Sequence, residues 1–271
     1  MTQPAAPQRF PGHPLPDSAA RRHFRALARS APWLSTSVRF SFAVPPAFQD
    51  PARGMEGRVE MIIRQREAVA AFDESGRLVY QREQFTADRG RDYVAAASAS
   101  SWQLPAGLTS PVFTSDRLVL RRPQIAGFGD LLPLPFLSTM LDPFEVAGAE
   151  PASLDLAFDH PTYIHELAET EFAGRRVMAA VLSAGYSYRP CLADFALVPP
   201  ETRTLLMLDA DTGICVHRRV LDAGSRASEI SLQVLAHNEY YIDSLFTAPA
   251  PTLTDVRAPI PWELRGDAGN G

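Results

Sequence analysis

Apolar and polar residues alternate through the last third of the chain and predict three consecutive antiparallel strands. An apolar run at 205–208 leads into an Asp- and Gly-rich turn at 209–213, after which the alternation resumes. Alternation on both sides of such a turn is a strong hairpin signal. Residues 229–236 alternate again after a second turn. We therefore expect a β-meander over 204–236, with Gly213 at positive φ.

The strand that follows the first turn carries polar residues on both of its expected faces. Strict alternation places Arg218 beside Ile214 and Val216 on one face, and His217 beside Cys215 on the other.

An amphipathic helix is predicted near the amino terminus. Asp17 or Ser18 can cap it, and the apolar pattern runs to about Arg29. The face opposite the apolar one carries four arginines that we expect to be solvated, namely Arg21, Arg22, Arg25 and Arg29.

The middle of the chain predicts further strands and one short helix. Residues 37–44 alternate as a half-buried strand, and 59–84 contains a strand pair around the turn at 73–76. A short helix is expected over 133–141, and a strand over 177–182 with an extension at Tyr186–Tyr188. With roughly eight to eleven antiparallel strands, the fold class is mainly β with a few helices: a strongly curved sheet or open half-barrel covered by helices.

The two ends of the chain differ in composition from the middle. Residues 1–16 hold five prolines, and 249–271 is again proline-rich. Both are expected to be tails that flank a single domain at 17–248. We find neither the apolar run of a secretory signal nor the long apolar stretch of a transmembrane segment, and so expect a cytoplasmic protein.

Composition excludes several classes of chemistry. The net charge of −5 does not favour a nucleic-acid partner. All 26 basic residues are arginine, a bias typical of a GC-rich bacterial genome, and the absence of lysine excludes Schiff-base and P-loop chemistry. Cys191 and Cys215 are too few for a disulfide framework or a zinc site, and both are expected to be buried, inert thiols. No cofactor is expected.

Short motifs occur in a fixed order over about residues 18–247. The amino-terminal helix and first strand are followed by Asp73-Glu-Ser-Gly76, and then by Leu141-Asp142-Pro143 leading into Val146-Ala-Gly148. Three more motifs complete the order: Glu171-Phe-Ala-Gly174-Arg175, Leu208-Asp209-Ala-Asp-Thr-Gly213 and Ile242-Asp243-Ser-Leu-Phe246. This order resembles the LolA-like lipoprotein-carrier fold. The resemblance implies an open β-barrel whose helices cap a hydrophobic cavity that accepts acyl chains.

Eight apolar residues are candidates for the lining of such a cavity. Ordinary core packing requires the same alternation, so both interpretations stay open. The candidates are Phe40, Phe42, Met61, Ile63, Trp102, Phe136, Leu137 and Met140.

Five polar residues are candidates for catalysis. His160 and His165 titrate near neutrality and suit acid–base work, although an exposed polar loop before a strand or helix at 167–172 is the simpler interpretation. Their spacing matches no common metal motif, so no metal is expected. Tyr188, Asp194 and Tyr241 could polarise a carbonyl in an apolar pocket, but such tyrosines are more often core rings.

The sequence therefore predicts a protein that holds an apolar small molecule or acyl chain in the cavity of an open β-barrel. One alternative is an enzyme of the cyclase or isomerase type, in specialised metabolism, that folds an apolar substrate there. Another is a regulatory sensor or interaction domain that uses a sheet edge. A cavity lined only by apolar groups favours the carrier, and an imidazole or carboxylate pointing into it favours the enzyme. A dry, filled core with an exposed edge strand favours the interaction domain. The oligomeric state is not predicted.

Overall fold

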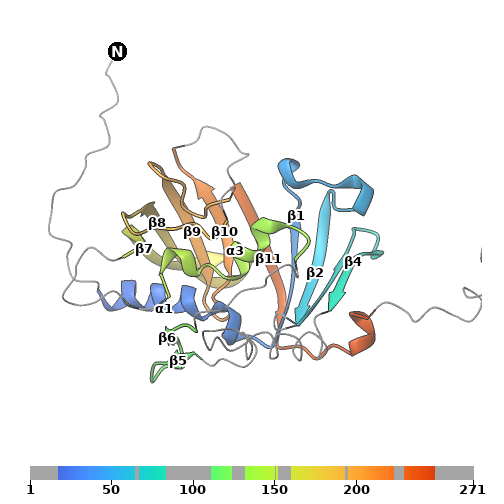
Figure 1. Cartoon of the computed structure of the whole chain (residues 1–271), viewed down its shortest axis with the longest axis horizontal. Helices are drawn as coiled ribbons and strands as arrows, with labels where there is room; N and C mark the ends of the chain where they lie inside the picture. Colours follow the sequence, from blue (N-terminus) through green and yellow to red (C-terminus); the bar gives the residue numbers. More distant parts are fainter. Residues whose placement is uncertain are drawn as a thin grey trace, which may run out of the picture.

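Nine strands form one antiparallel sheet in the order β4-β3-β2-β1-β11-β10-β9-β8-β7 (Figure 1). The computed structural model describes residues 18–64, 67–83, 111–123, 132–149, 151, 160–192, 195–222 and 229–247. The strands of the sheet are β1 (Ser37–Ala43), β2 (Arg58–Arg64), β3 (Ala68–Phe72), β4 (Leu78–Glu83), β7 (Thr162–Phe172), β8 (Arg175–Ala184), β9 (Arg203–Asp209), β10 (Cys215–Val220) and β11 (Glu229–His237).

Helices and a small second sheet complete the described structure. The α-helices are α1 (Ala19–Leu34) and α3 (Pro135–Leu141), and the second sheet pairs β5 (Val112–Phe113) with β6 (Val119–Arg121). Short 3-10 turns are η1 (Pro46–Phe48), η2 (Pro51–Arg53), η5 (Phe144–Val146) and η7 (Asp243–Leu245). Within the described ranges, no helix is both long enough and apolar enough to cross a bilayer.

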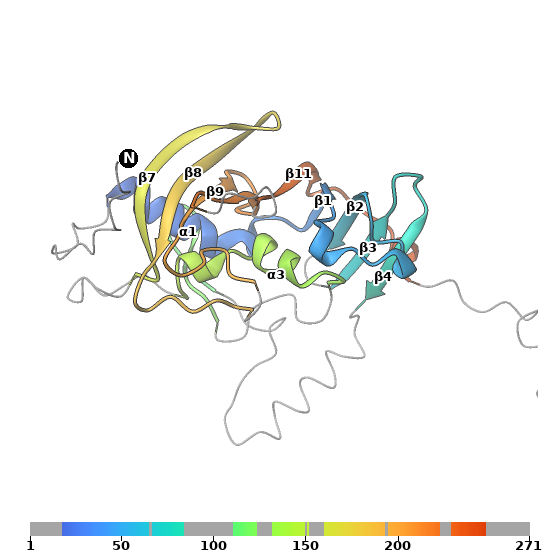
Figure 2. The ribbon, with the colours of Figure 1, turned by 90° about the horizontal axis from the view of Figure 1, so that it is seen from above.

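The sheet is open and bent. Its edge strands, β4 and β7, lie at opposite ends of the strand order. From above, α1 and α3 lie on the same side of the bent sheet (Figure 2). This confirms the predicted fold class, and the adjacent strands β9, β10 and β11 confirm the predicted meander.

The two faces of the sheet differ because side chains alternate along each strand. We call inner the face that carries Phe40, Met61 and Val234, which lie side by side on β1, β2 and β11 and are nearly inaccessible to solvent. We call outer the opposite face, on which Ser41 of β1 lies across from Gln233 of β11. The main hydrophobic core fills the inner face.

The predicted strand ends near residues 160–188 need correction. β7 begins at Thr162, so His165 lies in a strand rather than in a loop. β8 ends at Ala184, and Tyr186–Tyr188 lies beyond it rather than extending it. Edge strand β7 pairs with β8 and leaves most of its side chains exposed, and this exposure is why it can hold a largely polar sequence.

Two arginines predicted to be solvated are buried. Arg25 and Arg29, on α1, are 4% and 3% exposed. Arg25 donates to the backbone oxygen of Thr162 at 2.9 Å, and Arg29 donates to that of Val119 at 3.2 Å. Backbone carbonyls therefore supply the acceptors that buried guanidinium groups need, and the prediction of a solvated arginine face was wrong at these two positions.

A bulge in β10 changes the predicted faces of that strand. The register pairs Cys215 with Leu208 and His217 with Met207, and so skips one residue. Because the extra residue shifts the alternation, Cys215 and Arg218 both lie on the inner face. The prediction that Arg218 and Cys215 lie on opposite faces was therefore wrong.

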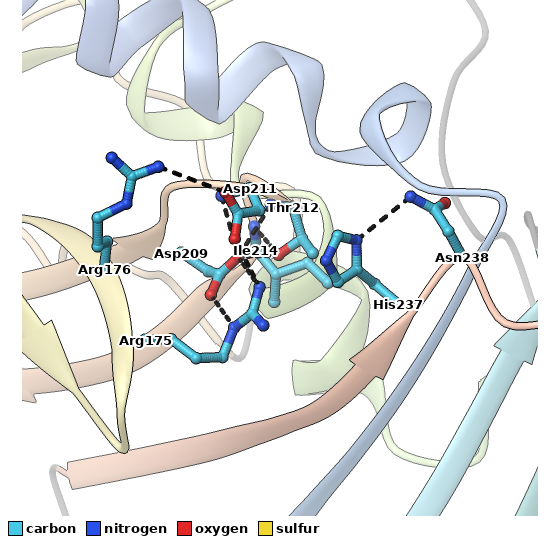
Figure 3. A network of polar contacts seen from close by, with 8 residues as sticks. All are labelled: Arg175, Arg176, Asp209, Asp211, Thr212, Ile214, His237 and Asn238. Carbon is cyan, nitrogen blue, oxygen red and sulfur yellow. Dashed lines mark hydrogen bonds and ion pairs between the residues drawn. The ribbon is translucent and has the colours of Figure 1, made fainter.

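Asp209 organises the turn between β9 and β10 (Figure 3). Its buried carboxylate accepts hydrogen bonds from Arg175 of β8 at 2.6 and 3.0 Å, and from the backbone and hydroxyl groups of Thr212 at 2.9 and 2.8 Å. Gly213 follows at φ 70°, as predicted. One carboxylate thus joins the turn to the neighbouring strand.

A smaller apolar cluster lies on the outer face of β2 and β3. Ile62, Ala68 and Ala70 pack there against Phe246, which comes from the chain segment after β11. The Arg64 guanidinium stacks on the Phe246 ring at 5.0 Å and pairs with Asp243 at 2.6 Å. The last described residues thus cover this end of the sheet.

Candidate functional site

A cavity of about 1290 Å³ lies where β1 and β11 diverge. Their paired register ends at Phe42 and Leu232, although β11 continues back to Glu229. The cavity takes side chains from both faces of the sheet at this point. It also takes residues from η1, from the 195–200 segment and from the tip of the β7–β8 hairpin.

The inner wall of the cavity is apolar. Phe42 and Leu232 come from the sheet and, at 2% and 0% exposed, also belong to the main hydrophobic core, so the half-buried Phe48 and Phe195 supply more of the accessible apolar surface. Phe48 projects from η1, where two prolines end β1, and its ring lies 4.9 Å from that of Phe136 and 6.2 Å from that of Phe195. An apolar ligand at this wall would contact aromatic and branched side chains.

The outer wall of the cavity is polar. Ser41, Ser231 and Gln233 line it, together with Arg58 at the start of β2. The Nη2 atom of Arg58 donates to the Ser41 hydroxyl and to the Gln233 amide oxygen, each at 2.9 Å. These contacts fix the position of one positive charge at the mouth of the cavity.

The β7–β8 hairpin bounds the outer side of the cavity. Its tip residues Phe172 and Ala173 line the cavity. The Phe172 ring lies 5.3 Å from the ring of His217 on β10. Burial lowers the pKa of His217, whose Nδ1 lies 2.9 Å from the Ser231 hydroxyl.

The 195–200 wall is held from beneath by a buried arginine. Arg218 of β10 donates to the carbonyls of Leu197 at 3.0 Å and Ala196 at 2.9 Å, and it stacks 4.9 Å from the Phe195 ring. Burial lowers the pKa of Arg218. Because Arg218 also lines the cavity, one side chain connects the sheet, the wall and the cavity.

A buried carboxylate holds the same segment from its other side. Glu145, 3% exposed, accepts hydrogen bonds from the amides of Cys191 at 2.7 Å and Leu197 at 2.6 Å. The Tyr188 hydroxyl donates to it at 2.7 Å and accepts from the amide of Val198 at 3.1 Å. Burial first, and then the nearby carboxylate, raise the pKa of Tyr188.

The two cysteines have different environments. Cys215 is fully buried, and burial raises its pKa to about 12, so its thiol is protonated and unreactive near neutral pH. Cys191 is exposed, and the expectation that it is buried was wrong.

Among the eight predicted cavity residues, Phe42 lines the cavity described above. Trp102 lies outside the described residues. The other six are at most 4% exposed and belong to the main hydrophobic core: Phe40, Met61, Ile63, Phe136, Leu137 and Met140. Their direct role in ligand binding stays a prediction.

The predicted catalytic residues do not converge on one place. His165 of β7 lies 2.8 Å from the Ser183 hydroxyl, with its pKa lowered by burial, and His160 precedes the same strand. Tyr188 belongs to the Glu145 network, whereas Tyr241 packs in the small cluster on β2 and β3, at the other end of the sheet. Burial and its hydrogen bond to Glu239 raise the pKa of Tyr241 to about 12. Asp194 lies outside the described residues, and catalysis by any of these residues stays a prediction.

Sequence reasoning did not single out the residues that line the cavity, apart from Phe42. Phe48 follows two prolines and Phe195 lies in an irregular segment, so neither has a periodic neighbourhood. Arg218 was the one sequence feature that could have indicated this site, because it is a charged residue that follows Ile214 and Val216 in an otherwise apolar alternation.

Comparisons with known proteins find likeness among solved structures. No protein-family model matches the chain, and no curated protein matches its sequence. Among solved structures, the chain is similar to the crystal structure of MucB, with a TM-score of 0.33 and 15% sequence identity. The match covers 85% of this chain and 63% of that one, so the chain spans less than two thirds of MucB. The likeness concerns the fold alone.

Proposed function

We propose that this protein binds the apolar chain of a lipid-like molecule in the cavity between β1 and β11. The observation that carries the proposal is the size and lining of the cavity. Its volume of about 1290 Å³ exceeds the ~300–1,000 Å³ of sites for small ligands. Phe42, Phe48, Phe195, Ile230 and Leu232 supply its apolar wall. A long alkyl chain is the ligand that such a volume and lining favour.

The opening of the cavity also suits a chain that enters from solvent. The open sheet leaves β1 and β11 free to diverge beyond Phe42 and Leu232. The chain can lie along the inner wall, where burying each methylene group contributes about 0.8 kcal/mol. Among the described residues that line the cavity, Glu229 supplies the carboxylate that the enzyme alternative expects, and it lies across from Arg219 in the β10–β11 register.

Phe48→Asp tests this proposal. Phe48 is half-buried on a short turn, so its substitution should change the cavity while leaving the sheet intact. A carboxylate at the apolar wall must stay hydrated, and it should therefore weaken binding of an apolar probe. We expect titration with N-phenyl-1-naphthylamine to show about a tenfold or greater loss of affinity.

Phe113→Asp is the matched control. It makes the same chemical change at a phenylalanine of β5 that is 48% exposed and does not line the cavity. The control should bind the probe like the unmodified protein. Equal probe affinity for Phe48→Asp and the control, or a lack of probe binding by the unmodified protein, would contradict the proposal.

A further inference from the structure

The cavity has two chemically different walls because it spans both faces of the sheet. Alternation along β1 and β11 places Phe42 and Leu232 on the inner wall, and Ser41 and Gln233 on the outer wall. The divergence of the two strands brings both faces into one space. A purely apolar ligand would leave the polar wall without a hydrogen-bonding partner.

Arg58 is the exposed cation of the polar wall, and its donors are only partly used. A guanidinium carries five N–H donors. Only the two bonds from Nη2 to Ser41 and Gln233 occur within the described residues, where Nε and Nη1 make none. Those two bonds orient the group and leave donors for a ligand.

Carboxylates lie near Arg58, and one of them, that of Glu74, accepts a hydrogen bond from the Arg58 backbone N–H at 3.0 Å. Over the ranges that the structure covers, no carboxylate forms an ion pair with the Arg58 guanidinium. Glu60, two residues along β2, pairs with Arg39 at 3.6 Å. Glu229, the carboxylate among the residues that line the cavity, lies directly across from Arg219 in the β10–β11 register.

We propose that the ligand is an amphiphile with an anionic head group, a phosphate or a carboxylate, and that Arg58 binds this head. The inference rests on the proposed function, which supplies the site for the alkyl chain. Ser41 and Gln233 hold the guanidinium in place. Charge-assisted bonds from the guanidinium favour an anion over a neutral head.

Arg58→Gln distinguishes head-group recognition from chain binding. We would measure the binding of dodecyl phosphate, 1-dodecanol and inorganic phosphate by calorimetry. The unmodified protein should bind dodecyl phosphate at least about tenfold more tightly than 1-dodecanol. Arg58→Gln should remove most of that preference and leave binding of 1-dodecanol unchanged, while Arg58→Lys should keep part of the preference.

Arg176→Gln is the matched control, because it removes an arginine whose side chain is 78% exposed and which does not line the cavity. It should leave the binding of all three compounds unchanged. Equal affinity for dodecyl phosphate and 1-dodecanol, or an equal effect of Arg58→Gln on both, would overturn the head-group assignment alone. Binding of inorganic phosphate as tightly as dodecyl phosphate would indicate a site for free anions instead. If neither alkyl compound binds the unmodified protein, both proposals fail.

Discussion

Gly213, in the β9–β10 turn, lies directly against the backbone of Leu27 in α1. A Cβ atom placed on Gly213 would lie 2.7 Å from the Leu27 carbonyl oxygen and 3.1 Å from the Cα of Ala31. The turn also requires φ 70° at this position, a region that residues with a side chain rarely adopt. Both the close approach of α1 and the positive φ therefore require glycine at position 213.

Gly213→Ala should destabilise the protein more than the same change in an open turn. Gly174 lies at φ 78° in the β7–β8 turn, and a Cβ atom there would have no other atom within 4 Å, so Gly174→Ala measures the cost of the backbone conformation alone. That cost is about 1 kcal/mol. Gly213→Ala has this backbone cost and must also displace α1. Its loss of folding free energy should therefore exceed that of Gly174→Ala by about 1 kcal/mol or more. Urea denaturation of both variants measures the difference, and equal values would contradict the close contact.

Glu145→Gln should weaken the 188–198 segment. The carboxylate accepts from Tyr188, Cys191 and Leu197, and an amide in its place brings two donors where acceptors are needed. We expect a loss of about 2–3 kcal/mol in the free energy of unfolding, because hydrogen bonds to a buried charge are strong. Tyr188→Phe removes one donor to the carboxylate and the acceptor of the Val198 amide, but leaves the bonds from Cys191 and Leu197, and should cost less. Denaturation midpoints that rank the two variants in the opposite order would refute this account.

Acid should remove the stabilisation supplied by Asp209. Burial alone would raise the pKa of this carboxyl group, but hydrogen bonds from Arg175 and Thr212 outweigh burial and hold it below its ordinary value of 3.8. A folded-state pKa below the unfolded one stabilises the fold above pH 3.8, and this contribution is lost as the pH falls toward the folded-state pKa.

Asp209→Asn should therefore lower stability at pH 7 and flatten its decline between about pH 5 and pH 2. Asp222→Asn, at a carboxylate of which 42% is exposed, should change the profile little. Thermal melting across this pH range compares the two variants. A decline for Asp209→Asn as steep as that of the unmodified protein would contradict the prediction.

Met140→Asp should destabilise the protein strongly. Met140 is fully buried in the main core, on α3, and an unpaired carboxylate there must be protonated or must open the core to water. We expect a loss of about 3 kcal/mol or more. The comparison with Phe48→Asp, at the cavity wall, is informative because that variant should stay folded. A Met140→Asp protein that melts like the unmodified one would indicate a hydrated space at α3.

The strands and turns followed from local features of the sequence. Alternation fixed β1 and β11 because one face of each strand packs on the core while the other is polar. Turn chemistry fixed the β9–β10 hairpin, where Asp209 bonds to the turn and Gly213 supplies the positive φ. Residues that contribute to these signals are close in sequence, so their pattern alone predicts the structure.

The site depended on contacts between residues far apart in the chain. Arg25 is buried because it bonds to Thr162, 137 residues away, and no local pattern distinguishes it from a solvated arginine. The bulge in β10 places Arg218 on the inner face, and the divergence of β1 from β11 opens the cavity beside it. Hydrophobic periodicity in the sequence determined which residues are buried. Only the tertiary structure decided where the cavity lies, because the cavity depends on where strands that are distant in sequence pair and where their pairing ends.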